Sequence, residues 1–473
     1  MPEPRPVAAR DDTAADIARA DRDDTAASTP RSAVSWIIPV LIAVAATAAY
    51  GTLSTLQWRT LQAPSWDLGI FSELAKAYSR LEAPIVPIKG DDVNLLGDHF
   101  HPILALLGPI WAIWPSGLAL LWTQAALFGV SAIPLARLAI ERLGTVTGTL
   151  AGIAYAFSFG LQSAQDVQFH EIAFGVPILA MSLTRLLRGK VLSACIWGGL
   201  LVFVKEDLGL TVLMLGLVIA LRGRAHRLEG IGLALWGGGW FVLSTFVILP
   251  LLNTAGQYDY TDNLGSLWEV LVPLDKWQTV VMLVLLAGCV GLRSPLMVLM
   301  LPTLAWRFTG TVEFYWDWYW HYNAVLMPIA LASLLDVAPR LRPWNRAVAV
   351  IASFGVTAIL AGSMPLADLV RPASWEPTWR AEPARAAMEA VPDGATVATD
   401  ITLMSPLVTD HDVQWTHGPN RRVPQCVLTD LYAFSWGTAP PTSTAAWADE
   451  HYGQAPGTFS ETFADGGFAV ACR

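Results

Sequence analysis

The sequence predicts an all-α polytopic membrane domain of about eleven transmembrane helices, followed by a small extracytoplasmic α/β domain. Three observations support this fold class. The 473-residue chain is 54% hydrophobic and only 15% charged, with a mean hydropathy of +0.45, whereas soluble domains carry roughly 25% charged residues. Long apolar runs alternate with polar connections. Beyond about residue 366 the composition becomes polar.

The N-terminal part consists of a polar tail and a first apolar run. Residues 1–32 are rich in Ala, Asp, Arg and Thr and predict a disordered cytoplasmic tail. The run 33–56 is long enough to cross a membrane and lacks a convincing cleavage site, so we expect a retained helix. It opens a transmembrane domain at 33–365, whose later apolar runs are 117–140, 144–163, 171–188, 190–204, 206–221, 228–250, 277–293, 295–309, 322–338 and 344–362.

Basic residues fall in alternate connections between these runs, which predicts that those connections are cytoplasmic. The N-terminus would then be cytoplasmic and, after eleven crossings, the C-terminus extracytoplasmic, in a bacterial plasma membrane. Residues 57–116 would form the first extracytoplasmic loop. Its segment 102–115 contains three prolines and is too short to span, so we expect a re-entrant or interfacial helix there. The basic residues are Arg137, Arg142, Arg185, Arg188, Lys190, Arg222, Arg224, Arg227, Arg293, Arg340, Arg342 and Arg346.

The C-terminal part, residues 366–473, reads as a small α/β domain. Segments 395–400, 425–430 and 467–472 look like short strands between Pro, Gly and Asp turns, and 378–391 looks like a helix. Cys426 and Cys472 can pair if this part lies in an oxidising compartment, and the sequence leaves that open. The net charge of −9 and the lack of a Gly-rich phosphate loop do not predict a nucleic-acid partner.

Acidic residues cluster in the predicted outer loops, beginning with Asp67 in SWDLGIFSE (65–73). A helix is expected to start near Ser65, so Asp67 may be read in two ways. Its carboxylate is either stabilised by the helix dipole or acts as a general base at the membrane surface. Both interpretations remain open at this stage. Asp166 and Glu171 lie in the second outer loop.

Three further motifs carry candidate binding groups. In LLGDHFHP (95–102), the residues Asp98, His99 and His101 suit a divalent cation or, if the histidines are protonated, a phosphate. The triplet Lys205, Glu206 and Asp207 interrupts an apolar run. Either Lys205 neutralises its acidic neighbours in a structural role, or it contacts an anionic head group while a carboxylate orients an acceptor. The aromatic run FYWDWYWHY (314–322) is either an interface anchor or a wall for a sugar, with Asp317 and His321 as polar contacts. Arg307 is a further candidate cation.

The segments SWDLGIFSE, LLGDHFHPILALLGPIWAIWP, QFHEIAFGVPILA and VKEDLGLTV resemble signature blocks of an uncharacterised family of predicted prokaryotic membrane proteins. The resemblance covers roughly residues 50–435. That family is in turn similar to the GT-C glycosyltransferases, which include protein mannosyltransferases and aminoarabinose transferases. This similarity implies a polyprenyl-phosphate sugar donor and inverting transfer at the outer face. It also implies that Asp67 is the catalytic carboxylate and Asp166 or Glu171 a second acidic group. The chain departs from the pattern because Leu68, and not a second carboxylate, follows Asp67.

The resulting prediction is a membrane glycosyltransferase that takes a polyprenyl-phosphate-linked sugar and contacts membrane lipids. A transporter or flippase of a lipid-linked substrate, or a non-catalytic membrane scaffold, are the alternatives. Its cofactor is unknown, with a divalent cation at Asp98 and His99 as one possibility. The predicted catalytic residues are Asp67, Asp166 and Glu171, and the predicted substrate-binding residues are His99, His101, Lys205, Glu206, Asp207, Arg307, Asp317 and His321.

Overall fold

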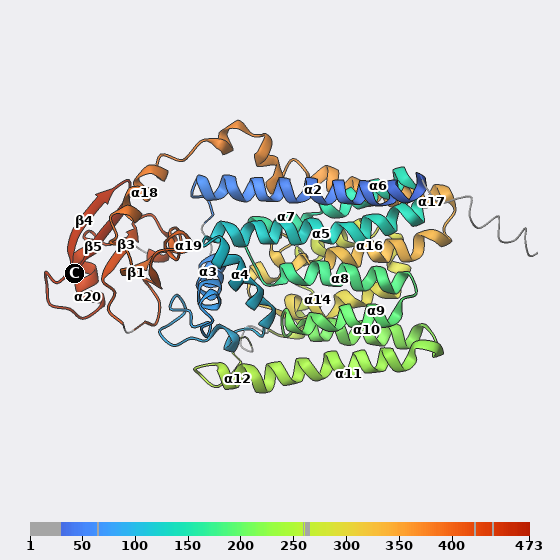
Figure 1. The fold of residues 1–473 in the computed structure, drawn as a ribbon, viewed down its shortest axis with the longest axis horizontal. Helices are drawn as coiled ribbons and strands as arrows, with labels where there is room; N and C mark the ends of the chain where they lie inside the picture. The colour runs from blue at the N-terminus through green and yellow to red at the C-terminus, as the bar shows by residue number, and fades with distance from the viewer. Residues whose placement is uncertain (1–29, 64–65, 259, 261–264, 421, 438) are drawn as a thin grey trace, which may run out of the picture.

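The computed structural model describes residues 30–473, apart from 64–65, 259, 261–264, 421 and 438. Its helices run side by side along the long axis of the molecule, and a five-stranded sheet lies beyond one end of the bundle (Figure 1). The predicted fold class, a helical membrane domain with a small C-terminal α/β part, is confirmed in this outline. Residues 1–29 of the predicted tail, and Ser65 as the start of a helix, lie outside the described residues.

Each predicted apolar run contains helix, in chain order. In several runs a short apolar helix precedes or follows the main helix, such as η3 (Leu200–Phe203) after α9 and η9 (Pro295–Met300) before α14. The helices of the bundle are α2 (Pro30–Arg59), α5 (Gly117–Leu143), α6 (Thr145–Ala156), α7 (Phe159–Asp166), α8 (Ile172–Leu187), α9 (Val191–Gly199), α10 (Leu208–Arg222), α11 (Arg227–Leu243), α12 (Leu249–Leu252), α13 (Lys276–Leu286), α14 (Leu301–Thr309), α15 (Glu313–Trp316), α16 (Leu326–Val337) and α17 (Pro343–Leu360).

The predicted number of about eleven transmembrane helices is not confirmed. Within the described residues, four helices are long and apolar enough to cross a membrane, or up to five if a pair bent by 65° forms one span. The difference arises because several runs break. The run 144–163 divides into α6 and α7 around Ser158, and α13 ends at Leu286 just before Gly288 and Cys289, which both have positive φ. The resulting pieces are shorter than the ~20 residues that a 30 Å hydrocarbon core requires.

Small residues bring α10 and α11 into close contact. A Cβ atom added to Gly216 would lie 2.3 Å from the backbone nitrogen of Ala234, and one added to Gly230 would lie 2.4 Å from that of Ala220. Such contacts allow the two backbones to approach closely, as is common between membrane helices. The glycines in these apolar runs therefore serve helix packing.

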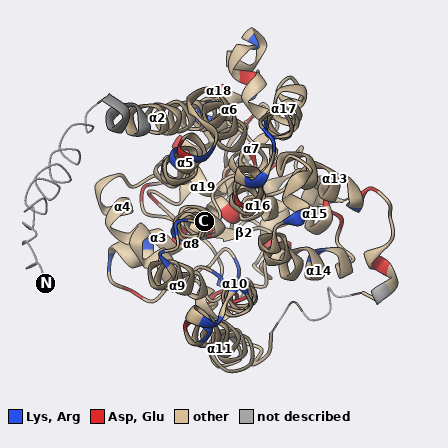
Figure 2. Cartoon of the chain, turned by 90° about the vertical axis from the view of Figure 1, so that its right-hand side faces the viewer, with Lys and Arg blue, Asp and Glu red and all other residues tan. Residues whose placement is uncertain are grey.

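Arginines gather at the end of the bundle farthest from the sheet (Figure 2), and two of them contact residues near the end of α16. Arg142, at the end of α5, donates to the carbonyl oxygen of Leu335 at 2.7 Å, and Arg222, at the end of α10, pairs with Asp336 at 2.8 Å. Asp336 is largely buried, so this pair lies in the protein and not in bulk solvent. The basic connections found in the sequence thus meet at one end of the molecule.

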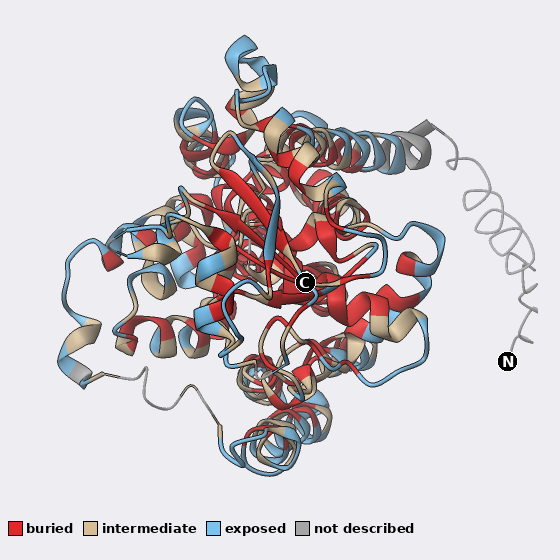
Figure 3. Cartoon of the chain, turned by 90° about the vertical axis from the view of Figure 1, so that its left-hand side faces the viewer, coloured by how far each residue is buried: buried red, intermediate tan, exposed pale blue. Residues whose placement is uncertain are grey.

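The C-terminal sheet has the strand order β2-β1-β3-β5-β4. β1 pairs in parallel with β2 and β3, whereas β5 pairs antiparallel with β3 and β4. Three of the strands and helix α18 lie where the sequence predicts them, and the central strands are buried (Figure 3). The elements are α18 (Ala381–Glu389), β1 (Thr396–Thr399), α19 (Met404–Leu407), β2 (Asp412–Trp415), β3 (Cys426–Asp430), α20 (Thr444–His451), β4 (Ser460–Asp465) and β5 (Phe468–Cys472).

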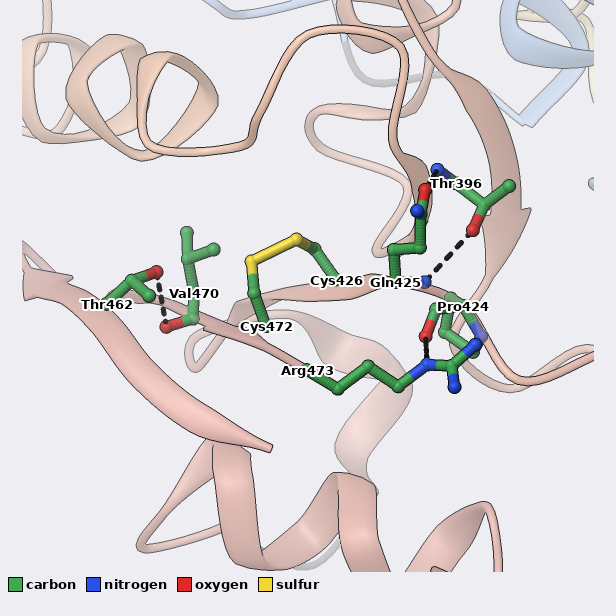
Figure 4. The surroundings of a disulfide bond; sticks show 8 residues. All are labelled: Thr396, Pro424, Gln425, Cys426, Thr462, Val470, Cys472 and Arg473. Carbon is green, nitrogen blue, oxygen red and sulfur yellow. Dashed lines mark hydrogen bonds between the residues drawn. A yellow bond between two sulfur atoms is a disulfide. The ribbon is translucent and has the colours of Figure 1, made fainter. Parts of the chain in front are cut away.

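A disulfide joins Cys426 and Cys472, the pairing that the sequence left open (Figure 4). The two residues are direct partners in the antiparallel register of β3 and β5. The bond therefore fastens the last strand of the chain to the middle of the sheet.

The sheet domain is docked on α3 (Trp66–Ser79), a helix of the first loop. The Nζ atom of Lys76, a buried residue, donates to the carbonyl oxygens of Val408 and His411 at 2.8 and 2.7 Å. Glu73, also buried, accepts from the backbone nitrogen of Val413 at 3.1 Å. These contacts hold the start of β2 against the helix that carries Asp67.

Candidate functional site: a polar cavity at the end of the bundle

A cavity of about 810 Å³ lies between the first loop, the ends of the bundle helices and the sheet domain. Two residues of the sheet domain, Ile401 and Phe434, belong to its lining. The polar lining residues are Asp67, Lys89, Asp98, His99, His101, Asp166, Gln168, His170, Glu171, Lys205, Glu206, Asp207 and Thr245, and the aromatic ones include Trp66, Phe71, Tyr258, Tyr260, Trp306, Phe314, Tyr315, Trp320, His321 and Tyr322.

The structure brings together almost all of the predicted site residues. Asp67, from α3, lies in one wall with His99 and Asp166, although these residues come from separate connections of the chain. Arg307 and Asp317 are the two predicted residues that are not part of the lining.

Asp67 is the accessible carboxylate of the cavity, and His170 lies behind it. The distance from Nε2 of His170 to Oδ2 of Asp67 is 3.2 Å; the aspartate side chain is 42% exposed and the histidine only 4%. Nδ1 of His170 faces the carbonyl oxygen of Gln168 at 3.1 Å. Because a carbonyl oxygen only accepts, Nδ1 carries a proton and Nε2 is the atom that can share one with Asp67.

Two buried glutamines fix the position of His170. Gln124 donates through Nε2 to the carbonyl oxygen of Gln168 at 2.9 Å and accepts from the backbone nitrogen of His170 at 3.0 Å. Gln168 has a φ of 74°, which is unfavourable for a residue with a side chain. Strain of this kind persists only where surrounding contacts impose it, and it gathers at functional sites. The ring of His321 stacks on the ring of His170, with the ring centroids 3.6 Å apart.

Ion pairs neutralise most of the other carboxylates. Nζ of Lys205 lies 2.7 Å from Oε1 of Glu171, whose side chain is 2% exposed. Burial opposes the charge of both groups, but their mutual attraction prevails: the pKa of Glu171 is well below its usual value and the pKa of Lys205 well above. Both side chains are therefore ionised at neutral pH.

A second chain of contacts runs from Glu206 to Lys89. Nδ1 of His99 and Oε1 of Glu206 are 2.8 Å apart, and Nζ of Lys89 lies 2.6 Å from Oδ1 of Asp98. Tyr260 stacks on His99 at 4.6 Å and donates to Asp98 at 3.0 Å. Burial and Lys205 lower the pKa of His99, but Glu206 and Asp98 outweigh them and raise it above its ordinary value. In this wall, His99 therefore lies close to two carboxylates that favour its protonated form.

Among the described residues, Asp166 and Asp207 accept hydrogen bonds from neutral donors and form no ion pair. Asp166 accepts from Gln57 at 2.6 Å and from Tyr319 at 2.9 Å, and Asp207 accepts from the indole of Trp306 at 3.1 Å. Burial raises the pKa of Asp166, and it raises that of Asp207 to about 6 despite the opposing charge of Lys205. Asp207 can therefore take up a proton near pH 6, whereas the lowered pKa of Glu171 keeps that carboxylate ionised there.

Arg307 and Asp317, both predicted to bind substrate, support the aromatic wall from behind. Arg307 is fully buried and donates to the carbonyl oxygens of Tyr315 and Asp317 at 2.6 and 3.1 Å. The carboxylate of Asp317 accepts from the backbone nitrogen of Tyr319 at 3.1 Å. These two residues thus support the 313–322 segment, of which Phe314, Tyr315, Trp320, His321 and Tyr322 line the cavity.

The geometry does not support the cation site predicted at Asp98 and His99. No group of three or more His, Cys, Asp or Glu side chains is placed to hold a metal ion anywhere in the described part of the chain. Lys89 and Tyr260 contact Oδ1 of Asp98, and Glu206 contacts Nδ1 of His99, so one potential ligand atom of each residue already has a partner. The residues present do not fit a metal centre, and no step is assigned to one.

Several buried polar atoms of the lining have no hydrogen-bond partner among the described residues. Most of them belong to buried side chains, and burial without a partner is costly. Such atoms are candidates for ligand contacts. They are Nδ1 of His101, Nε2 of His170, Nδ1 of His321, Oε1 of Gln168, Oγ1 of Thr245 and Oδ1 of Asp207; Nε2 of His170 lies near Asp67 at 3.2 Å without forming a hydrogen bond.

Sequence reasoning missed His170 as a partner of Asp67, and Lys89 as the partner of Asp98. His170 lies in the segment QFHEIAFGVPILA, next to the predicted Glu171. The sequence therefore showed its place in the chain, but not that its side chain faces Asp67. Sequence reasoning also did not single out Tyr258 and Tyr260. No periodic pattern marks these residues, because a long irregular connection delivers them.

The fold and the cavity define a multi-spanning helical membrane protein whose polar site lies at one end of the bundle, closed by an α/β domain. The chain belongs to the family described as Predicted membrane protein (DUF2079), whose model matches residues 57–415. The match includes α3, all of the cavity residues of the bundle and the sheet domain up to β2. No curated protein matches the chain.

Proposed function

We propose that this protein is a membrane glycosyltransferase of GT-C type that moves a sugar from a polyprenyl-phosphate donor to an acceptor hydroxyl. The observation that carries the proposal is the pair of Asp67 and His170: an accessible carboxylate on the cavity surface, backed by a buried, rigidly positioned imidazole. An acceptor hydroxyl is a weak nucleophile, and a positioned base that removes its proton contributes typically 10²–10⁴-fold to the rate.

The remaining lining suits a sugar bound through its lipid phosphate. Aromatic rings such as Trp306 and Tyr322 offer apolar faces, and carboxylates such as Asp207 offer acceptors for hydroxyl groups. Lys205 has three donor hydrogens, and among the described residues its Nζ contacts only Glu171, so it retains donors for a phosphate oxygen. In this scheme Asp67 is the base, and Lys205 with protonated His99 stabilises the leaving phosphate.

We also propose that the cavity opens on the extracytoplasmic side of the plasma membrane. Two features support this orientation. The arginine-rich connections gather at the opposite end of the bundle, as cytoplasmic connections do. The disulfide between Cys426 and Cys472 belongs to the domain beside the cavity, and disulfides persist in oxidising compartments. The lipid-linked donor fits this side, because nucleotide sugars do not reach it.

The test is transfer of labelled sugar from polyprenyl-phosphate donors to a panel of acceptors by the purified protein in proteoliposomes. We expect turnover by the wild type and a loss of about 10²-fold or more for Asp67→Asn. Glu382→Gln, at an exposed glutamate of α18, is the matched control and should transfer at the wild-type rate. Equal turnover by Asp67→Asn would remove Asp67 from the mechanism. Movement of the intact donor between leaflets without transfer would favour a flippase.

A further inference from the structure

A second hollow, of about 490 Å³, lies on the outside of the bundle at the end of α2. Its walls are the last turns of α2, Trp122 of α5, and the segment that joins α17 to α18, which passes beside α2 (Figure 1). We call it the α2 groove. It is separate from the cavity described above and is lined by Thr52, Thr55, Leu56, Arg59, Thr60, Trp122, Trp375, Pro377 and Arg385.

The charge in the α2 groove is positive. Arg59 and Arg385 both line it, and no Asp or Glu belongs to the lining. Arg385 donates to the backbone oxygen of Arg59 at 2.7 Å, which brings the two residues together, and its other contact is a 3.3 Å pair with the exposed Glu382. Arg59 is exposed, and its side chain makes no hydrogen bond or ion pair among the described residues. Two arginines that line one hollow are suited to a phosphate.

The depth of the α2 groove matches the head-group region of a membrane. Arg59 is the last residue of the candidate span Trp36–Arg59. Trp122 and Trp375 flank it, and tryptophan is enriched where a membrane meets water. Trp122 is held in place by donation to Thr55 at 3.1 Å, and Trp375 is 49% exposed.

A continuous stripe on α2 leads from the groove toward the middle of the span. Its residues are spaced by three or four and therefore share one helix face. Those nearest the groove are half-buried or exposed, and the small side chains beyond them leave room for a hydrocarbon chain. The stripe comprises Leu41, Ala45, Ala48, Thr52, Thr55 and Arg59.

We infer that the α2 groove binds an anionic membrane phospholipid, with its phosphate between Arg59 and Arg385 and an acyl chain along the α2 stripe. Because Arg59 belongs to the bundle and Arg385 to the sheet domain, the bound phosphate joins the two parts of the protein. This site does not depend on the proposed transferase activity.

The test measures lipid retention by the purified full chain in a neutral detergent, using native mass spectrometry during titration with dioleoylphosphatidylglycerol or dioleoylphosphatidylcholine. We expect tighter binding of the anionic lipid, weakened about tenfold by Arg59→Gln and by Arg385→Gln. Arg422→Gln, at an arginine that is 67% exposed and away from the groove lining, is the matched control and should bind as wild type. Unfolding midpoints check that the variants fold.

Two further measurements test the inferred lipid site. Arg59→Lys, which keeps the charge but loses the planar fork, should retain part of the preference for the anionic lipid. Glycerol 3-phosphate, which carries the phosphate without acyl chains, should compete only weakly. Equal binding of both lipids, or wild-type binding by both glutamine variants, would overturn the site. Competition by glycerol 3-phosphate as strong as by the lipid would overturn the lipid assignment.

Discussion

Replacing Lys205 by Met should destabilise the protein strongly, because it leaves the carboxylate of Glu171 buried without its partner. The two groups are 2.7 Å apart, with side-chain exposures of 13% and 2%. At an effective dielectric constant of about 20, unit charges at that distance attract by roughly 6 kcal/mol, and desolvation offsets most of this. The loss on breaking a buried pair is typically about 3–5 kcal/mol. We expect the lower end, since His99 and His101 also lie close to Glu171.

The assay is equilibrium unfolding of the purified protein in mixed micelles, followed by tryptophan fluorescence. The double variant Lys205→Met/Glu171→Leu removes both charges and should recover most of the lost stability, because no unpaired ion remains. Arg422→Gln removes two long pairs, of 3.8 Å to Asp91 and 4.0 Å to Asp92, made by an arginine that is 67% exposed, and should cost less than about 1 kcal/mol. The reasoning is refuted if Lys205→Met costs no more than this control, or if the double variant is no more stable than the single one.

Two further predictions concern the sheet domain. Burial raises the pKa of Glu73 to about 7, although Lys76 and the Val413 backbone lower it. The contribution of protonated Glu73 to the free energy of unfolding is full below the unfolded pKa of about 4.3. This contribution is lost as pH rises through 7, by up to about 3 kcal/mol. Unfolding midpoints measured from pH 5 to 8 should therefore fall less for Glu73→Gln than for the wild type, and parallel curves would contradict the assignment. Reducing the Cys426–Cys472 disulfide, whose sequence separation is 46, should destabilise the sheet domain by roughly 4 kcal/mol on the loop-entropy model. Proteolysis of the C-terminal segment with and without reductant measures this effect, and Cys289→Ser is the control.

The sequence predicted those helices and strands that the local pattern of apolar and turn residues specifies. The apolar runs predicted helices, and turn residues around 395–400, 425–430 and 467–472 located three of the strands. The charge pattern also grouped the cavity residues correctly at one end of the molecule. A run of apolar residues does not reveal a break inside it, however. The interruption at Ser158 follows from packing, so the expected number of spans was too high.

The details of the site depended on contacts between distant segments. His170 and Asp67 are about a hundred positions apart, and only the strained backbone at Gln168, held by Gln124, turns the imidazole toward the carboxylate. Arg307 was predicted to bind substrate because a leaving phosphate needs cationic stabilisation. Three carbonyl-type oxygens satisfy it instead, including the side chain of Asn323. Such compensation by backbone oxygens leaves no trace in the sequence.

Ile401 and Phe434 give the sheet domain a direct influence on what the cavity accepts. They follow β1 and β3, in connections that no membrane helix constrains. Substitutions there can reshape the chamber without disturbing the hydrocarbon-embedded framework. Under the proposed function, the substrate preference of proteins of this architecture would therefore diverge through two connections outside the bundle, while Asp67 and His170 stay the same.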